Sequence, residues 1–420
     1  MSKIENTFLW GRGSGGSASA TGTAFVAGQR IPGTPDPAGG SPFWSTFRQP
    51  VYRIPAMVIT DTGRIVIGAD YRSTARDQVA IAPAISYSDD NGKTWKRQVL
   101  AQDKFNIWNN GNARIMDQTM FYYKGVIHII AGTWNGTGNN TNWTQTRNDR
   151  TWSVTHFKSS DNGETWEVDM NFKAKLGGAF GQNTWFGGVG NAIITKFGTC
   201  VVPVQYSPAQ GRVAATAIYT NDGINWSIVS TGGGDGISEN SLVGFVDNSG
   251  RQEIIMLGRR DPNTPQNKKA LYIYQTGLTQ FGASWAEYTR YSAKIQARGG
   301  SGAQGSAIGN YDATKQVTDT NNIILSYAAN YLSTVNNYIR DNITVSFMIG
   351  LPANAGTRIT DVEIINPKPS GSQDNTFYGG YSILSYNATA NKLGIAYEDT
   401  LGIKYKDLSH LIKPWLLKGE

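Results

Sequence analysis

Residues 88–95 read Ser-Asp-Asp-Asn-Gly-Lys-Thr-Trp, and residues 159–166 repeat the phrase as Ser-Ser-Asp-Asn-Gly-Glu-Thr-Trp. Aspartate and asparagine side chains bond the backbone two residues further on, and glycine accepts a positive φ, so the phrase predicts a tight turn. The tryptophan that ends it would pack on the adjacent core. Weaker copies end at Trp226 and Trp285, so the four tryptophans are 71, 60 and 59 residues apart. We interpret the phrases as structural turns that mark a repeated unit, and not as catalytic residues.

The repeated unit and the composition together predict an all-β chain. A period near 60 residues accommodates about four short strands with their loops. The 420 residues include 49 glycines and 20 tyrosines, and short apolar runs alternate with turn residues, as in strand-rich proteins. Radial repetition of four-stranded antiparallel sheets forms a β-propeller, which we predict for residues 51–420. Residues 1–50, rich in Gly, Ser and Pro, are predicted to be an extended lead-in with one short strand near residues 24–27.

Several classes of protein are not supported by the sequence. The net charge of +7 is compatible with an anionic ligand, but no run of Lys and Arg suggests nucleic acid as a partner. No apolar segment of about 20 residues predicts a membrane span. The single cysteine, Cys200, excludes an internal disulfide and lies in a predicted buried strand. Three histidines far apart in the chain, His128, His156 and His410, form no zinc pattern, so we predict no metal and no cofactor.

A short motif precedes the repeated phrases, at residues 52–56, which read Tyr-Arg-Ile-Pro-Ala. An Arg-Ile-Pro motif ahead of S-x-D-x-G-x-T-W phrases resembles the bacterial sialidase (exo-neuraminidase) family, where they are called the RIP motif and the Asp-boxes. The resemblance extends over about residues 52–398. It implies six blades of four-stranded antiparallel sheets. It also implies a retaining exo-sialidase that removes terminal sialic acids from glycoproteins, glycolipids and oligosaccharides through a tyrosyl-enzyme intermediate.

The resemblance implies three arginines around the carboxylate of the ligand. The planar, permanently charged guanidinium of arginine bonds carboxylates through two parallel hydrogen bonds. Arg53 of the RIP motif matches the first arginine, and Arg340, ahead of Asn-Ile-Thr-Val, matches the third. The second arginine ends a strand, for which we select Arg259 with Arg260 as its rival.

The nucleophile of the family is a tyrosine, and Tyr381 occupies the matching position. The Ala-Tyr-Glu sequence that follows the next strand implies that Glu398 orients Arg53. The anomeric carbon of sialic acid already carries a carboxylate, which would repel an anionic Asp or Glu nucleophile but not a neutral phenol. A phenol with a pKa of about 10 is a weak nucleophile and needs a base beside it. Glu239, in Ile-Ser-Glu-Asn-Ser, matches that base.

The family pattern D-x-R followed by a loop and a second Asp matches residues 70–77. It implies that Asp77 is the acid/base, with Asp70 and Arg72 supporting it. Asp117, at the start of a later strand, matches an aspartate that contacts the sugar.

Other activities remain open on sequence grounds. The chain could be an endo-sialidase, a trans-sialidase, a glycosidase for another nonulosonic acid, or a non-catalytic propeller that only binds sialic acid. The presence of Asp77 and Tyr381 favours exo hydrolysis, because endo-acting relatives tend to lack both. We expect a secreted, cell-surface or virion-associated protein rather than a cytoplasmic one, although residues 1–10 contain no apolar signal core.

Overall fold

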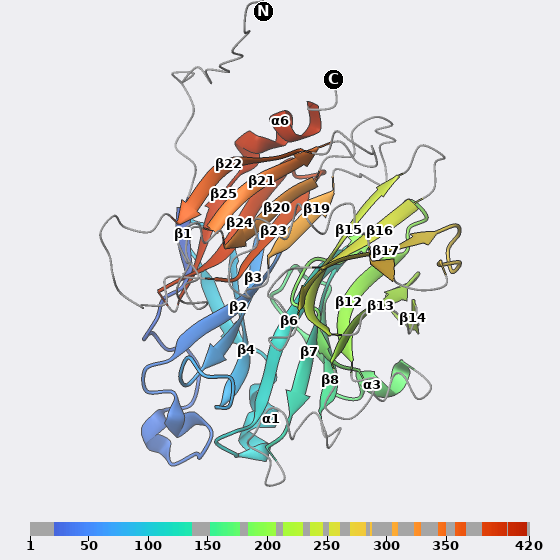
Figure 1. The fold of residues 1–420 in the computed structure, drawn as a ribbon. Coiled ribbons are helices and arrows are strands. Elements are labelled where there is room, and N and C mark those ends of the chain that lie inside the picture. The colour runs from blue at the N-terminus through green and yellow to red at the C-terminus, as the bar shows by residue number, and fades with distance from the viewer. Residues whose placement is uncertain are drawn as a thin grey trace, which may run out of the picture.

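The described residues of the computed structural model are almost entirely β-strands joined by turns (Figure 1). The structure describes residues 21–136, 152–176, 184–206, 213–229, 236–246, 252–260, 269–282, 286–287, 305–309, 323–328, 343–349, 358–366, 380–400 and 402–417. Within these residues no helix is long and apolar enough to cross a membrane. The prediction of an all-β chain is therefore confirmed.

The N-terminal part of the chain forms an eight-stranded sheet. Its strands are β2 (Val51–Ile59), β3 (Ile65–Arg72), β4 (Ile81–Ser88), β5 (Lys96–Val99), β6 (Arg114–Tyr123), β7 (Val126–Trp134), β8 (Ser153–Ser159) and β9 (Glu167–Asp169). Strands β2–β5 pair antiparallel with one another, and so do β6–β9. A single parallel pair, Ile81 with Arg114, joins the two groups.

Four smaller antiparallel sheets contain the other described strands. The first contains β10 (Thr184–Gly187), β11 (Ile193–Ile194), β12 (Cys200–Tyr206), β13 (Ala214–Thr220) and β14 (Ser227–Ile228). The second contains β15 (Ile237–Val246), β16 (Gln252–Arg260), β17 (Lys269–Gln275) and β18 (Ala286–Glu287), and the third β19 (Ser306–Gly309), β20 (Ile323–Ala328), β21 (Ile343–Ile349) and β22 (Arg358–Asn366). The fourth contains β1 (Thr21–Phe25), β25 (Gly402–Asp407), β24 (Lys392–Asp399) and β23 (Ser382–Asn387).

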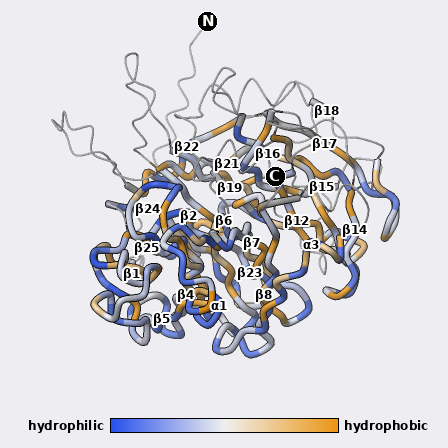
Figure 2. The backbone as a smooth tube through the Cα atoms, turned by 90° about the horizontal axis from the view of Figure 1, so that it is seen from below, coloured by the Kyte–Doolittle hydropathy of each residue, from blue (hydrophilic) through white to orange (hydrophobic). Residues whose placement is uncertain are grey.

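The inner strands of these sheets pack side by side around the centre of the molecule. Contacts link β2 with β6, β6 with β10, β12 with β15, β15 with β19, β19 with β23, and β23 with β2. Figure 2 shows β2, β6 and β19 near the middle of the molecule and β1, β5 and β14 at its periphery. The fold is thus a β-propeller of small antiparallel sheets, as predicted. The expected six separate four-stranded sheets are not what the hydrogen bonds define, because the Ile81–Arg114 pair joins two groups into one sheet.

Strand β1 closes the last sheet with residues from the predicted lead-in. Thr21 pairs with Lys406 at the outer edge of β25. The carbonyl of Ala24 accepts hydrogen bonds from Ser86 Oγ at 3.1 Å and Arg97 Nε at 2.6 Å, which fixes β1 to the first group of strands. The predicted short strand is therefore real, and it begins three residues earlier than expected.

The Asp-boxes are turns, as their composition predicted. In the first box Ser88 Oγ accepts a hydrogen bond from the backbone N–H of Gly92 at 2.8 Å, and Asp90 accepts from Thr94 N–H at 2.9 Å. Gly92 has φ +86°, the left-handed conformation that glycine adopts without steric cost. The second box repeats these bonds, from Gly163 N–H to Ser159 Oγ and from Thr165 N–H to Asp161. Trp285, which ends the fourth predicted box, lies outside the described residues.

The box tryptophans pack against the core, as predicted, but they are buried to different degrees. Trp95 is only half-buried, edge-on to Tyr405 with ring centroids 6.0 Å apart. Trp226 is buried and stands edge-on to Phe172 at 5.3 Å. The tryptophan of the first box therefore lies partly exposed against β25, whereas that of the third box is enclosed in a core.

The helices among the described residues are short and lie outside the sheets. The α-helices are α1 (Gln102–Trp108), α3 (Phe172–Lys175) and α6 (Ile412–Leu417), and the 3-10 helices are η1 (Pro37–Gly39), η2 (Trp44–Thr46) and η3 (Ser409–Leu411). Cys200 is buried in β12, as predicted.

Two of the three histidines meet in space, although they are far apart in the sequence. His128 Nδ1 lies 2.9 Å from His156 Nε2, and the rings stack with centroids 5.2 Å apart. Burial lowers the pKa of His128 to about 4 and that of His156 to about 3, so both rings are neutral at physiological pH. Among the described residues no set of three or more His, Cys, Asp or Glu side chains is arranged to hold a metal ion.

Candidate active site

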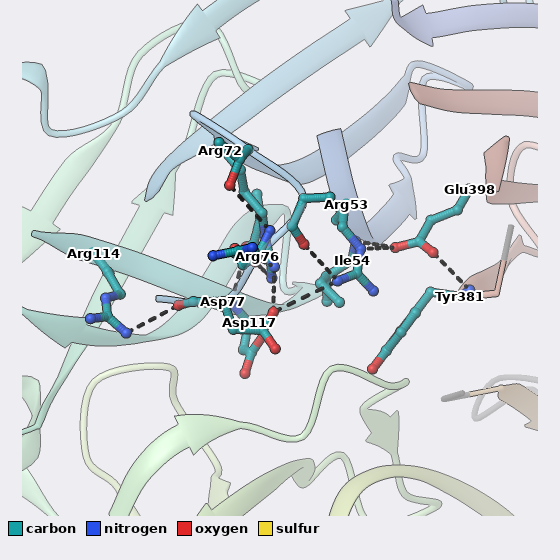
Figure 3. Close-up of polar contacts among 12 residues, drawn as sticks. Arg53, Ile54, Arg72, Arg76, Asp77, Arg114, Asp117, Tyr381 and Glu398 are labelled. Atoms are coloured by element: carbon teal, nitrogen blue, oxygen red, sulfur yellow. Dashed lines mark hydrogen bonds and ion pairs between the residues drawn. The ribbon is translucent and has the colours of Figure 1, made fainter. Parts of the chain in front are cut away.

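The RIP motif lies at a bulge in β2. The register with β3 shifts between Arg53 and Ala56, and Ile54 has φ +54°, a strained value for a β-branched residue before proline. The bulge turns the N–H of Ile54 toward Glu398 on β24, whose Oε1 accepts it at 2.9 Å. The same oxygen lies 3.4 Å from Arg53 Nε. Glu398 therefore contacts both Arg53 and the backbone of the RIP motif from the last sheet of the propeller (Figure 3).

Glu398 also fixes the backbone of Tyr381, which lies directly before β23. Its Oε2 accepts the N–H of Tyr381 at 3.3 Å, and its own N–H donates to the carbonyl of Tyr381 at 3.0 Å. The ring of Tyr381 packs with Ile54 and Val189. The guanidinium of Arg53 lies over this ring, 5.6 Å from its centroid. One buried carboxylate thus sets the positions of an arginine and a tyrosine on different sheets.

The hydroxyl of Tyr381 meets a glutamate and a second arginine. It donates to Glu239 Oε1 on β15 at 2.5 Å. Arg259 Nη1, from the end of β16, donates to Glu239 Oε2 at 2.8 Å and to the Tyr381 oxygen at 2.9 Å. Burial opposes the charge of Arg259, but Glu239 outweighs it and raises the pKa of the guanidinium, which is permanently charged. A carboxylate can therefore accept the phenolic proton while a cation stabilises the phenolate.

A cluster of aspartates and Arg72 lies across the site from Tyr381. Arg72, at the end of β3, donates through Nη2 to Asp70 Oδ2 at 2.7 Å and through Nη1 to Asp77 Oδ1. Asp70 Oδ1 accepts the backbone N–H of Asp117 on β6 at 3.0 Å. Asp117 sits at a second bulge and has φ +57°. The side chain of Asp77 is 57% exposed, so it is the most accessible carboxylate of this cluster.

Burial dominates the electrostatics of the two inner aspartates. It raises the pKa of Asp70 to about 6, against the opposing effect of the Arg72 guanidinium. The pKa of Asp117 is also raised, first by burial and then by the negative charges of Asp70 and Glu239. Desolvation and neighbouring negative charges favour the neutral form of a carboxyl group and so raise its pKa. Such shifted pKa values are frequent at functional sites.

The structure brings eight of the nine predicted site residues together. These are Arg53, Arg72, Asp77, Asp117, Glu239, Arg259, Tyr381 and Glu398. Arg340 lies outside the described residues. Arg259 contacts Glu239 and the Tyr381 hydroxyl, and β16 includes its rival Arg260, whose side chain is not described. Arg114, which the sequence reasoning missed, donates to the backbone carbonyl of Asp77 at 3.0 Å.

Comparisons with known proteins define the family. A BNR repeat-like domain matches residues 54–334, two-thirds of the chain. The sialidase of Paraclostridium sordellii is 32% identical over 378 residues, which cover 87% of this chain and 85% of that protein. The sialidase of Clostridium perfringens is 32% identical over 370 residues, 85% of this chain and 88% of that protein. The chain therefore has the fold and sequence of a glycoside hydrolase, and it belongs to the bacterial sialidase family.

Solved structures share the fold at lower identity. Trypanosoma rangeli sialidase superposes with a TM-score of 0.65 at 22% identity, over 95% of this chain but only 61% of its own. The intramolecular trans-sialidase of Ruminococcus gnavus superposes with a TM-score of 0.54 at 15% identity, over 85% of this chain and 94% of its own. At these identities the likeness concerns the fold alone.

Proposed function

We propose that this protein is a retaining exo-sialidase with Tyr381 as nucleophile and Glu239 as its base. The observation that carries the proposal is the 2.5 Å hydrogen bond from the Tyr381 hydroxyl to Glu239, in a buried site. A base within hydrogen-bond reach is what activates a weakly acidic nucleophile. Sialidases with a tyrosine nucleophile are a known exception to the two-carboxylate rule of glycosidases.

In the first step the Tyr381 oxygen bonds to the anomeric carbon while its proton passes to Glu239. The bond from that carbon to the glycosidic oxygen breaks, and Asp77 donates a proton to the departing oxygen. In the second step a water molecule attacks the anomeric carbon and gives a proton to Asp77. The bond to Tyr381 then breaks, and Glu239 returns the phenolic proton. Two displacements at one carbon leave its configuration unchanged.

The arginines supply the binding energy for the substrate carboxylate in this proposal. Arg53 and Arg259 both lie at the Tyr381 ring or hydroxyl, within reach of a carboxylate on the carbon under attack. Arg340 completes the set as a prediction from the sequence. Asp117 is proposed to contact the sugar, since its raised pKa favours a neutral carboxyl that can donate a hydrogen bond.

Further proposals concern the blades and the surroundings of the protein. We infer that β2–β5 and β6–β9 are two blades joined edge to edge, which together with the four smaller sheets makes six. The antiparallel pairing within each group and the ring of inner strands support this division. Because glycoproteins, glycolipids and oligosaccharides would be its substrates, we also propose that the protein acts outside the cytoplasm.

Incubation with sialyllactose tests the proposal directly. Thin-layer chromatography should show free sialic acid and lactose, and proton NMR should show the α-anomer of sialic acid forming first. Transfer of sialic acid to an added acceptor, or an anhydro product, would indicate trans-sialidase activity. Binding without any product would indicate a lectin-like propeller.

A further inference from the structure

The loop between β3 and β4, which carries Asp77, has an unusual set of anchors. The loop is closed at its neck by the Ser73 N–H, which donates to the carbonyl of Ala80 at 3.1 Å. Three consecutive carbonyls within it each accept a hydrogen bond from an arginine on a different strand. Arg53 Nη1 of β2 donates to Ala75 O at 3.3 Å, Arg72 Nη1 of β3 to Arg76 O at 3.3 Å, and Arg114 Nη1 of β6 to Asp77 O at 3.0 Å.

Arg114 is fully buried, as Arg72 is, but it differs from the other two arginines because it touches only the backbone of the loop. Its Nε donates to the carbonyl of Asn112 at 3.0 Å, and its guanidinium lies 4.7 Å from the ring centroid of Trp134 and 5.9 Å from that of Trp152. These contacts leave the side chain little freedom to move. Burial lowers the pKa of Arg114 to about 10, so it is still charged at neutral pH.

The carboxylate and the carbonyl of Asp77 are thus held by separate cations. Arg72 holds the carboxylate from β3, and Arg114 holds the carbonyl from β6. Figure 3 shows Arg114 and Arg72 approaching Asp77 from different sides. An exposed aspartate on an eight-residue loop has no regular secondary structure to fix it, so these contacts determine where its carboxyl group lies.

We infer that Arg114 is a positioning residue for Asp77, an inference that rests on the proposed function. Arg114 does not reach the reacting atoms. It fixes the main chain beside the acid so that the carboxyl group meets the glycosidic oxygen. Catalysis is sensitive to such placement, and a shift of about 1 Å costs on the order of 100-fold in rate.

The effect of Arg114 depends on the leaving group. A sugar alkoxide is a poor leaving group and needs a proton from Asp77, whereas an aryl oxide such as 4-methylumbelliferone leaves without one. General acid catalysis contributes about 10²–10⁴-fold. A misplaced acid therefore slows the cleavage of sialyllactose much more than that of an aryl sialoside. A merely structural role would lower both rates equally, since it reduces only the amount of folded enzyme.

The experiment compares kcat/KM for sialyllactose and for 4-methylumbelliferyl sialoside in Arg114→Met, Arg114→Lys and the unaltered protein. Asp77→Asn provides the reference pattern for a missing acid. Arg97→Met is the matched control, because Arg97 also donates to backbone carbonyls, those of Thr23 and Ala24, away from the site. Melting temperature and circular dichroism give the folded fraction of each variant.

We expect Arg114→Met to lose at least about tenfold more activity on sialyllactose than on the aryl substrate. Asp77→Asn should show the same preference for the aryl substrate. Arg114→Lys keeps the positive charge but not the planar guanidinium, so it should also lose more activity on sialyllactose than on the aryl substrate, by a smaller factor. If Arg114→Met does not fold, Arg114→Lys alone tests the inference. Arg97→Met should keep the ratio of the unaltered protein. Equal losses on both substrates, or no loss, would overturn the role of Arg114. An unaltered protein inactive on both substrates would instead overturn the proposed function.

Discussion

Aspartates at the Asp-boxes and aspartates at the site have pKa values that move in opposite directions. Hydrogen bonds from the Thr94 side chain and backbone lower the pKa of Asp90 to about 2, in a fully solvated turn. Burial raises the pKa of Asp70 to about 6. The same side chain therefore stabilises the fold at the rim of the propeller and carries a desolvation cost at its centre.

The backbone shows the same contrast. In the boxes the left-handed positions include Gly92 and Gly163, which adopt them without cost. At the site Ile54 and Asp117 adopt left-handed conformations that cost such residues free energy. The regular turns and strands at the rim stabilise the fold, and this stability offsets the cost of the strained backbone and buried charges at the site. Functional sites commonly depart in this way from the conformations that their residues prefer.

The largest expected effect concerns the phenol at the centre. Tyr381→Phe removes the hydroxyl that donates to Glu239, the proposed base, so kcat should fall by at least about 10³-fold. Affinity for a 2-deoxy-2,3-dehydro sialic acid inhibitor, measured by calorimetry, should be nearly unchanged because the arginines remain. Tyr397→Phe, a buried tyrosine on the neighbouring strand, is the control and should leave kcat nearly normal. Comparable kcat values for the two variants would contradict the assignment.

A smaller effect, on ligand affinity, is expected when one of the arginines proposed to bind the substrate carboxylate is altered. Arg53→Lys keeps the positive charge beside Glu398 but loses the two-pronged geometry that matches a carboxylate. Affinity for the same inhibitor should fall by about 10- to 100-fold, corresponding to about 1.5–3 kcal/mol for a charged hydrogen bond. Arg64→Lys is the matched control, since Arg64 binds Asp89 and Glu164 at the rim. Unchanged affinity in a folded Arg53→Lys protein would show that Arg53 does not bind the ligand carboxylate.

At the rim the effect should fall on stability alone. Trp95→Ala should lower the free energy of unfolding by about 2 kcal/mol, less than the ~3–5 kcal/mol of a fully buried tryptophan, because Trp95 is half-buried. Chemical denaturation measures the change, and turnover per folded molecule should be normal. A large loss of turnover with unaltered stability would place the first box in the catalytic machinery.

The smallest effects concern the pH dependence of stability, and they should differ in sign between the two regions. For Asp161 burial opposes the shift, but hydrogen bonds from Thr165 and Ser159 outweigh it and lower the pKa to about 2. Its contribution is thus fully present above about pH 4, the ordinary range of an unfolded aspartate, and is lost as the pH falls toward 2. Asp161→Asn should lower stability at pH 7 by less than about 1 kcal/mol, because the group is exposed.

Asp117 should behave in the opposite way. Its raised pKa means that the folded protein binds a proton more tightly than the unfolded chain, so stability falls as the pH rises above about 4. Asp117→Asn should therefore raise the melting temperature at pH 7, with a difference from the unaltered protein that shrinks toward pH 4, while lowering activity. Melting curves of both variants from pH 3 to pH 8 test the contrast. Shifts of the same sign at pH 7 would refute it.

The parts of the fold that the sequence could predict are those determined by neighbouring residues. The box turns close within eight residues, so Ser88 and Gly92 suffice to predict them. The contacts of Tyr381 with Glu239, 142 residues away, required a family resemblance because no local pattern encodes them. Neighbours on a strand point to opposite faces, so the structure alone could show that Arg259 faces the site.

Other features gave no usable pattern in the sequence. Residues before proline favour extended conformations, so the positive φ of Ile54 contradicts its local preference and depends on the hydrogen bond to Glu398. The pairing of β1 with β25 depends on closure of the ring. Arg114 appeared as an ordinary arginine at the start of a strand, because its partner is a backbone carbonyl, which any residue provides.

The central claim is that Tyr381 forms a covalent bond to the sugar. A 2,3-difluoro sialic acid slows both steps, but its fluoride leaves readily, so a glycosyl-enzyme should accumulate. Peptide mapping by mass spectrometry after this treatment should find the sugar on Tyr381 and on no other residue. An adduct on Glu239, Asp77 or any other side chain, or no adduct while activity is lost, would contradict the account.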